Sequence, residues 1–181
     1  MEKRVIAPGA KKGLGVTDVL LIGILLAAGA VLKFFAGQII NFGMKPNFII
    51  AMYCLIIILT KPRLGEAAII GILSGAICQF FPGQPYINFA SELSGALAMC
   101  LLSRIPLETG RIPVKNIVSA FLSTLVSGFT FIGVMYLLYY SGADITPTPL
   151  AIFMSIIFGT ACINAVIVQT LYVPLKIALK R

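Results

Sequence analysis

TDVLLIGILLAAGAVLKFFA, residues 17–36, is an apolar run with one acid near its start and one lysine near its end. A helix needs about 20 residues to cross the roughly 30 Å hydrocarbon core of a bilayer. Asp18 stands in the first turn of such a helix, where the helix dipole favours an acid. The run is long for a signal sequence, and no small-residue cleavage motif closes it. We therefore expect a first membrane-spanning helix that is retained in the chain.

Basic residues beside this run, and at three later points, set the expected topology. They form four clusters: Lys3/Arg4/Lys11/Lys12, Lys61/Arg63, Arg104/Arg111/Lys115 and Lys176/Lys180/Arg181. Cytoplasmic loops carry an excess of Lys and Arg. If all four clusters are inside, the chain crosses out and back between each pair, and 12 of its 14 Lys and Arg residues are cytoplasmic. We expect six spans with both termini inside, and only Lys33 and Lys45 towards the outside.

The other apolar stretches supply the remaining spans. The six are expected at about 17–36, 47–60, 66–81, 88–103, 114–140 and 150–173, the last fading at Pro174. Of the 181 residues, 59% are hydrophobic and 11% are charged. Soluble domains are about a quarter charged. We expect residues 1–181 to form a single integral membrane domain, an all-α multi-pass protein of a prokaryotic plasma membrane.

The composition also excludes several classes of function. The net charge of +8 comes from residues that flank spans, so anionic lipid headgroups are their expected partner rather than nucleic acid. There is no His, and the four cysteines stand in separate apolar stretches without a CxxC pair. The sequence has no GxxxxGK[ST] loop and no nucleophile beside a plausible base. We expect no enzyme activity, no metal and no cofactor in this chain.

Glu92 is the ionisable residue that most needs an explanation. It lies about one turn into the fourth expected span from the outside, and an acid inside a span is a candidate for a functional site. Asn88 projects from the same helix face four residues earlier, and Gly95 leaves space nearby. A carboxylate in an apolar site needs a cation to stay charged. Three alternatives are open: an internal lysine (Lys45 or Lys33), the ammonium of a ligand, or snorkelling to the surface.

Further polar residues lie around the expected outer loops. Lys45 precedes a helix whose N-terminal amides also favour an anion, so it could hold a ligand carboxylate or point to water and lipid phosphate. Gln79 and Gln84 flank the turn at residues 80–83, where amides and aromatic rings suit a flat ligand with polar edges. Asn164 lies deeper, where hydrogen bonding between helices is the better expectation. The expected substrate-binding set is Lys45, Asn47, Gln79, Gln84, Asn88, Glu92 and Asn164.

Small residues recur at helical spacing in two of the spans. They form two stripes: Gly23, Ala27 and Ala30 in the first span, and Ala68, Gly71 and Gly75 in the third. Such stripes let helix backbones approach closely. We expect the third-span stripe to pack inside the bundle. We expect the first-span stripe to dock a helix of another subunit, because so small a protein needs little extra packing contact of its own.

Three stretches resemble the motifs of a known family. Residues 43–47, GMKPN, resemble its GMKP followed by an acidic or amide residue, and residues 81–84 with Asn88 resemble its FPxGQxxN pattern. Ile163-Asn164 and the later Tyr172-Val173-Pro174 resemble its LN…YP. From about Gly37 onward, the chain resembles the tryptophan-transporter family among the substrate-binding S components of energy-coupling factor (ECF) transporters. It departs at Ser91-Glu92, where that family carries an Asp-Lys pair.

The resemblance implies an ECF S-component-like bundle that captures tryptophan or a related aromatic metabolite for uptake. It also implies that the small-residue face of the first span contacts a transmembrane T component, and that two cytoplasmic ATPase subunits spend the ATP. The alternative is a stand-alone secondary transporter or small channel, for which Glu92 would be a proton-coupling acid; such carriers show paired halves, and no convincing internal repeat is present. A purely structural subunit would leave the polar residues of the outer half unexplained.

Overall fold

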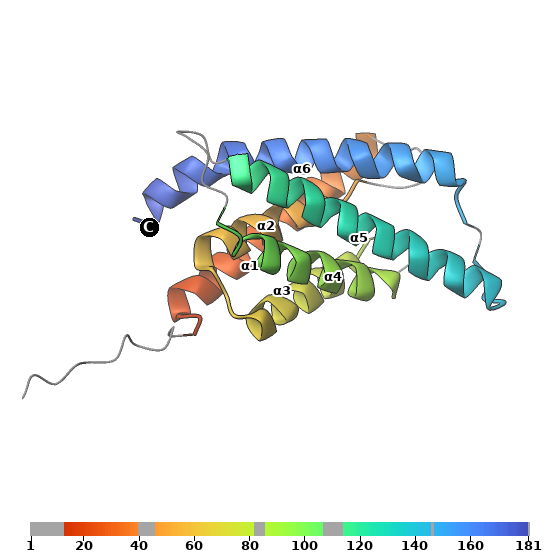
Figure 1. The fold of residues 1–181 in the computed structure, drawn as a ribbon, viewed down its shortest axis with the longest axis horizontal. Helices are drawn as coiled ribbons and strands as arrows, with labels where there is room; N and C mark the ends of the chain where they lie inside the picture. Colours follow the sequence, from red (N-terminus) through yellow and green to blue (C-terminus); the bar gives the residue numbers. More distant parts are fainter. Residues whose placement is uncertain (1–12, 40–45, 82–85, 107–113, 146, 181) are drawn as a thin grey trace, which may run out of the picture.

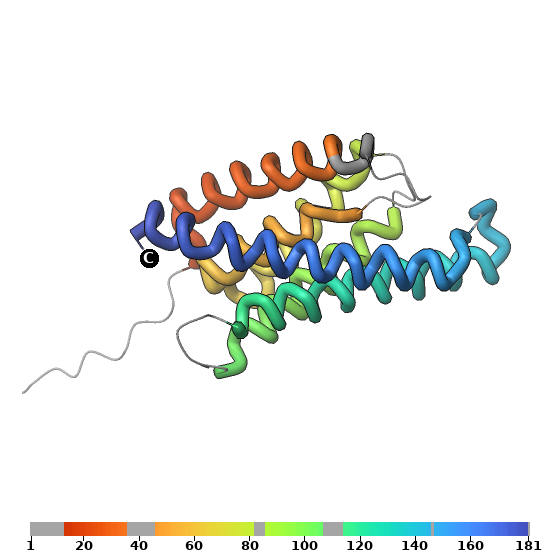
Figure 2. Tube along the Cα trace, turned by 90° about the horizontal axis from the view of Figure 1, so that it is seen from above, coloured from red at the N-terminus to blue at the C-terminus, as the bar shows by residue number. Residues whose placement is uncertain are grey.

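The computed structural model describes residues 13–39, 46–81, 86–106, 114–145 and 147–180, which form six α-helices and no strand (Figure 1). The helices are α1 (Val16–Ile39), α2 (Ile49–Thr60), α3 (Leu64–Cys78), α4 (Ile87–Leu102), α5 (Val114–Tyr140) and α6 (Leu150–Ala178). Consecutive helices run in opposite directions along the long axis of the molecule, so the start of α1 and the end of α6 lie at the same end (Figure 2).

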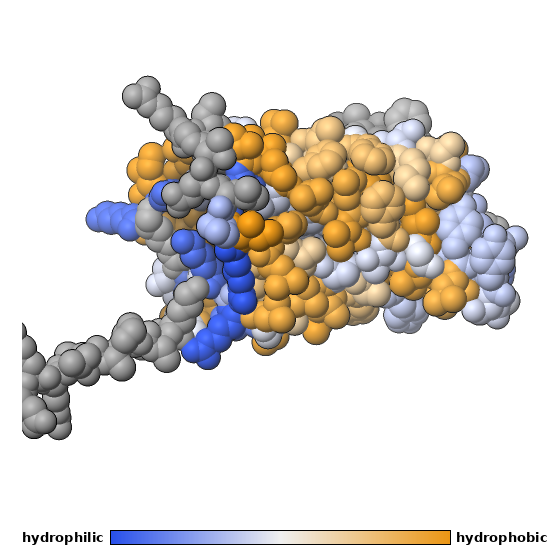
Figure 3. Space-filling view, in the orientation of Figure 1, coloured by the Kyte–Doolittle hydropathy of each residue, from blue (hydrophilic) through white to orange (hydrophobic). Residues whose placement is uncertain are grey.

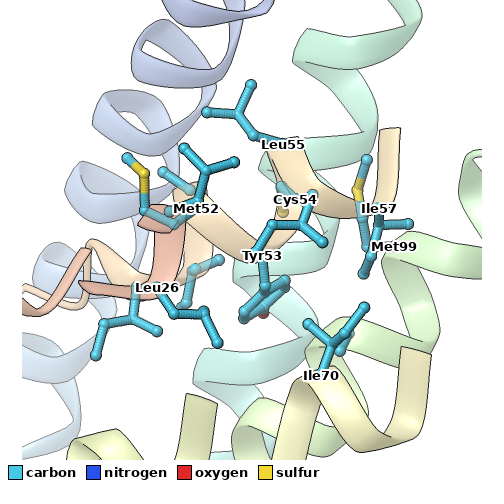
Figure 4. Packing of buried hydrophobic residues seen from close by; sticks show 14 of the residues in the cluster. Leu26, Met52, Tyr53, Cys54, Leu55, Ile57, Ile70 and Met99 are labelled. Atoms are coloured by element: carbon cyan, nitrogen blue, oxygen red, sulfur yellow. The ribbon is translucent and has the colours of Figure 1, made fainter. Parts of the chain in front are cut away.

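Helix α2 is the centre of the bundle, packed against each of the other five helices. Ten of its 12 residues are buried, on every side of the helix. A helix that is apolar all round is stable only where neighbours cover its whole surface. Figure 4 shows side chains such as Met52, Tyr53 and Leu55 leaving α2 in different directions towards the surrounding helices. Because α2 is apolar on every side, it is stable at the position where the other five helices surround it.

The outer surface of the bundle is apolar over most of its length. Large aliphatic and aromatic side chains are exposed on α1, α3, α5 and α6, among them Ile24, Ile69 and Val166. Figure 3 shows these residues as a broad orange band, with hydrophilic residues gathered at the end where the C-terminus lies. A soluble monomer rarely exposes so large an apolar patch. Lipid is the solvent that suits this surface.

The helices differ in whether their length alone allows a full crossing. Three are long and apolar enough to span a membrane: 16–35 within α1, and α5 and α6 over their full lengths. Helices α2, α3 and α4 have 12, 15 and 16 residues, less than the about 20 that an untilted crossing needs. The described residues thus form an all-α bundle, as expected of a membrane protein, with three helices long and apolar enough to cross a bilayer and three shorter apolar helices.

Five of the six helices differ from the expected spans at one end or both, by one to five residues, and two of these ends need a physical explanation. Helix α6 continues through Pro174 to Ala178, because proline removes one backbone donor while later bonds such as Leu179 N–H to the Leu175 carbonyl at 3.0 Å are still formed. Helix α2 begins at Ile49, two residues after Asn47, whose side-chain oxygen accepts the Ile49 N–H at 3.3 Å. Asn47 therefore lies just before the N-terminus of α2, outside the helix.

The two small-residue stripes have different surroundings. A Cβ on Gly71 would lie 2.8 Å from Leu93 Cα, and one on Gly75 would lie 2.9 Å from Phe89 Cα, so the α3 stripe packs directly on the α4 backbone. The expected internal packing of this stripe is confirmed. On α1, Gly23 and Ala27 are exposed, and a Cβ on Gly23 would meet no atom of the described residues within 4 Å.

Candidate functional site

Polar side chains from five helices and from the segment before α2 meet inside the bundle. We call this group the polar cluster: Lys33 of α1, Asn47, Cys78 of α3, Glu92 of α4, Thr124 of α5 and Asn164 of α6. Lys33, Glu92 and Asn164 are 7%, 1% and 0% exposed, although each carries a charge or an amide. Burying such groups is costly unless they are paired. The polar cluster is therefore the part of the interior that packing alone does not explain.

Asn47 connects the two sides of the polar cluster. Its side-chain amide donates to Glu92 Oε1 at 2.5 Å and points at Cys78 Sγ at 3.7 Å. Its backbone carbonyl accepts a hydrogen bond from Asn164 Nδ2 at 3.2 Å. Its side-chain oxygen also accepts the Ile49 N–H, so Asn47 has contacts with four other residues. This residue ties the start of the central helix to α4 and α6.

Lys33 is a buried cation with weak partners. Its Nζ donates to Cys78 Sγ at 3.1 Å and lies 5.2 Å from the centre of the Phe81 ring. A thiol sulfur is a weak acceptor, while an ammonium has three N–H donors. Lys33 and Glu92 attract each other electrostatically but share no hydrogen bond, since Oε1 accepts from Asn47 and Oε2 has no partner among the described residues.

Two buried acceptors of the polar cluster are left without donors in the part of the chain that the structure describes. They are Glu92 Oε2 and Asn164 Oδ1. The amide nitrogen of Asn164 is occupied, donating to the Asn47 carbonyl and to Thr124 Oγ1 at 3.3 Å. Buried polar atoms in folded proteins nearly always have a hydrogen-bond partner. These two oxygens thus lack the donors that buried acceptors usually have.

A second, smaller polar group lies beneath the first, towards the middle of α2. The Tyr53 side chain is 0% exposed, and its hydroxyl lies against Gly95, so closely that a side chain there would collide with it. Ser123 Oγ donates to the Gly95 carbonyl at 2.9 Å. The sequence predicted that Gly95 leaves space near Glu92, and the Tyr53 side chain occupies the space beside Gly95.

The residues expected to bind substrate fall into three groups. Asn47, Glu92 and Asn164 lie together in the polar cluster. Gln79 directly follows Cys78 in the sequence, and Asn88 lies four residues before Glu92; both are half-buried. Gln79 Nε2 donates to the Gly75 carbonyl at 2.8 Å. The other two expected residues, Lys45 and Gln84, lie outside the described residues.

The burial of Glu92 resolves one of the alternatives left open by the sequence. A snorkelling acid would extend its carboxylate to the surface, but the Glu92 side chain is 1% exposed and its Oε1 is hydrogen-bonded to Asn47 inside the bundle. The cation that balances it is therefore an internal lysine or a ligand. Of the two internal candidates, Lys33 lies in the same cluster.

Sequence reasoning missed three members of the polar cluster. From the sequence, Lys33 is only a possible partner of Glu92, and neither Cys78 nor Thr124 stands out as a candidate for the site. The signal for Lys33 was present, because an ionisable residue inside a span faces the bundle interior far more often than lipid. Cys78 and Thr124 carry no such signal, since both are common in ordinary helix packing.

The described residues contain no group of three or more His, Cys, Asp or Glu side chains arranged to hold a metal ion. Their polar cluster consists of one ammonium, one carboxylate, two amides, a thiol and a hydroxyl. Such a set recognises charges and hydrogen-bonding groups on a small molecule. It supplies no activated nucleophile.

Comparisons with known proteins agree with a transport role. The family described as "Tryptophan transporter TrpP" matches residues 16–180. A protein named probable tryptophan transport protein, from Clostridium acetobutylicum, is 26% identical over 156 residues, covering 84% of this chain and 88% of the relative. Another of the same name, from Clostridium perfringens, is 28% identical over 177 residues, covering 91% and 94%. No solved structure matches the chain significantly.

The family match covers all six helices and every described member of the polar cluster. Its members are described as transporters, which agrees with the expectation of a membrane transport protein and not an enzyme. The chain belongs to the tryptophan transporter family.

Proposed function

We propose that this chain is the substrate-capturing membrane subunit of an ATP-driven, ECF-type importer, and that its substrate is tryptophan or a related aromatic metabolite. The observation that carries the proposal is the polar cluster, in which a buried ammonium, a carboxylate and two amides converge between helices, and two acceptors have no partner among the described residues. The names of the two clostridial relatives support tryptophan as the substrate.

The proposed binding site is the outer half of the bundle. Asn47, Glu92 and Asn164 form its floor, because they are already connected by hydrogen bonds across α2, α4 and α6. Lys45 and Gln84 would complete it from the two neighbouring loops, and Gln79 and Asn88 would line it from the ends of α3 and α4. Charged and amide groups at such a site recover the cost of removing water from a zwitterion.

The proposed disposition is a single domain, residues 1–181, crossing a prokaryotic plasma membrane six times with both termini inside. The gathering of hydrophilic residues at one end of the bundle (Figure 3) supports it, because cytoplasmic ends carry the excess of Lys and Arg. Short helices such as α2 can cross only where neighbours cover them, and α2 is enclosed by the other five helices.

The proposed partners are a transmembrane T component and two cytoplasmic ATPase subunits. The sequence has no nucleotide-binding loop of its own. The stripe of Gly23, Ala27 and Ala30 would dock the T component. Its support is that Gly23 and Ala27 are exposed, with space over Gly23, whereas the comparable stripe on α3 is already packed against α4.

The direct test is binding by the solitary purified protein. Titration calorimetry in detergent should show saturable binding of tryptophan, and mass spectrometry of the protein purified from native membranes should identify the retained molecule. The same purification should recover a T component and two ATPases. Failure to bind tryptophan would reject the proposed substrate, and a T component absent from repeated purifications would reject the proposed coupling.

A stand-alone secondary transporter is the competing function, and the buried, partly unpartnered Glu92 is the observation that favours it. A carboxyl group in that position could carry a proton. Uptake that continues in the presence of a protonophore but stops when ATP is depleted supports the importer. Uptake abolished by the protonophore while ATP is maintained supports the secondary transporter.

A further inference from the structure

The structure assigns Lys33 and Glu92 as the two opposite charges that receive an amino-acid backbone, Lys33 its carboxylate and Glu92 its ammonium. This inference rests on the proposed function and deepens it, because it assigns the residues that hold the two charges of an α-amino acid. It also moves the carboxylate partner from Lys45, which the sequence favoured, to a lysine buried inside the bundle.

Donors and acceptors in the polar cluster are out of balance on both sides. On the Lys33 side there are too few acceptors: one ammonium faces a thiol sulfur at 3.1 Å and an aromatic ring. On the Glu92 side there are too few donors: Glu92 Oε2 and Asn164 Oδ1 are buried without a partner among the described residues. Asn47 lies between the two sides, bonded to Glu92 and directed at Cys78.

No other acid among the described residues is placed to take the position of a ligand carboxylate beside Lys33. The sequence has six acids. Asp18 and Glu66 belong to the opposite end of the bundle, where they accept the Gly15 and Leu14 N–H groups. Asp144 follows α5, beyond its last residue. Glu2 and Glu108 fall in the basic segments, outside the described residues, and residues 40–45 and 82–85 contain no acid.

A zwitterion matches the two sides of the polar cluster. The ammonium of an amino acid has three N–H donors, and among the described residues Glu92 Oε2 and Asn164 Oδ1, on two residues that are hydrogen-bonded to Asn47, lack donors. The carboxylate of the amino acid is bonded to the same carbon as the ammonium and would reach Lys33. A carboxylate accepts strong, charge-assisted hydrogen bonds from a lysine ammonium, which the neutral thiol of Cys78 cannot do. A molecule with one charge would satisfy one side and leave the other buried and uncompensated.

The test compares three ligands on the wild-type protein by calorimetry: tryptophan, tryptamine, which lacks the carboxylate, and indolepropionate, which lacks the amine. Loss of one member of a buried charge pair weakens binding by about 30-fold or more. Tryptophan should therefore bind at least about 30-fold more tightly than either analogue. If tryptamine binds as tightly as tryptophan, no group of the protein holds the carboxylate and the inference is overturned without any variant.

Variants then identify the residue. Lys33→Met should lower the affinity for tryptophan and for indolepropionate by about 30-fold or more, and leave the affinity for tryptamine nearly unchanged. Because ligands are compared on one variant, a loss of active protein affects them all equally and cancels. Lys33→Arg, which keeps the cation, should retain the preference for ligands with a carboxylate and serves if Lys33→Met does not fold. Equal weakening of all three ligands would make Lys33 a structural residue.

Two further lysines complete the design. Lys176→Met is the matched control, because Lys176 also lies over an aromatic ring, 5.7 Å from the Tyr172 centre, but on the exposed surface of α6. It should leave all three affinities unchanged. Lys45→Met should show no selective loss of ligands with a carboxylate; if it does and Lys33→Met does not, the assignment to Lys33 is wrong. A wild-type protein that binds no tryptophan rejects the proposed function together with this inference, whereas tryptophan binding that is indifferent to Lys33 rejects this inference alone.

Discussion

The side chain of Asn47 donates a hydrogen bond to Glu92 Oε1 across 45 positions of sequence. This contact joins the entrance of the central helix to the buried acid of α4. Since Asn164 also binds the Asn47 backbone carbonyl, any shift of the segment before α2 moves the groups that face Glu92. The same residue thus controls both the start of a helix and the shape of the polar cluster.

Glu92→Gln should lower the affinity for tryptophan and for tryptamine by about 30-fold or more, and the affinity for indolepropionate much less. The reason is that the amide keeps the size of the side chain but removes the charge that meets an ammonium. Calorimetry on the solitary protein measures the ratio. Equal losses for tryptophan and indolepropionate would mean that Glu92 supports the fold or pairs with a lysine instead.

Asn47→Ala should lower both the affinity for tryptophan and the thermal stability. The substitution leaves Glu92 Oε1 without its donor and removes the side chain that accepts the Ile49 N–H at the start of α2. Loss of the hydrogen bond to the Ile49 N–H costs about 0.5–1.5 kcal/mol, and a buried unpaired acceptor costs about 1–3 kcal/mol. Thermal unfolding in detergent measures the sum; an unchanged midpoint would contradict the role assigned to this residue.

Gly95→Ala should destabilise the bundle by about 1–3 kcal/mol, because the added methyl group meets the Tyr53 hydroxyl and lies 2.9 Å from Ser127 Cβ. Tyr53→Phe removes the nearest atom and should restore part of the loss in the double variant. Gly133→Ala is the matched control, since a Cβ there meets nothing within 4 Å of the described residues. The measurement is the thermal unfolding midpoint of the wild type, Gly95→Ala, Gly95→Ala/Tyr53→Phe and Gly133→Ala. Equal midpoints for Gly95→Ala and Gly133→Ala would contradict the packing argument.

Ala27→Trp should abolish association with the T component while leaving tryptophan binding intact. The exposed small-residue stripe on α1 would be filled by a large side chain, which separates the helix backbones. Ala151→Trp, at an exposed alanine of α6, is the control for a bulky group on the lipid-facing surface. Co-purification and calorimetry on the same preparations separate the two effects. Loss of ligand binding with docking retained would assign the stripe to internal packing.

Cysteine labelling tests the proposed topology. In a variant without the native cysteines, Ser141→Cys should react with an impermeant reagent from outside, and Gly110→Cys only after the cells are permeabilised. Ser141 is preferred to Gly142, whose backbone φ of +87° disfavours a side chain. The expectation follows from the distribution of Lys and Arg. Labelling of Gly110→Cys in intact cells would exclude six spans with both termini inside.

The sequence by itself determined the class of the protein and the existence of its helices. Apolar runs, proline and glycine boundaries and basic flanks act within short stretches of chain, so helices such as α5 (Val114–Tyr140) could be located without any tertiary contact. The same local reasoning singled out Asn47, Glu92 and Asn164, because a polar group in an apolar stretch stands out wherever it packs.

Tertiary structure alone decided which of these groups meet and which small-residue stripe is free. Lys33 reaches Cys78 across 45 positions, and Asn164 reaches the Asn47 carbonyl across 117, separations that no helical periodicity encodes. The stripes on α1 and α3 look alike in sequence, yet one is exposed and the other lies on the α4 backbone. The physical reason is that helix formation is local, whereas burial depends on which helices surround α2.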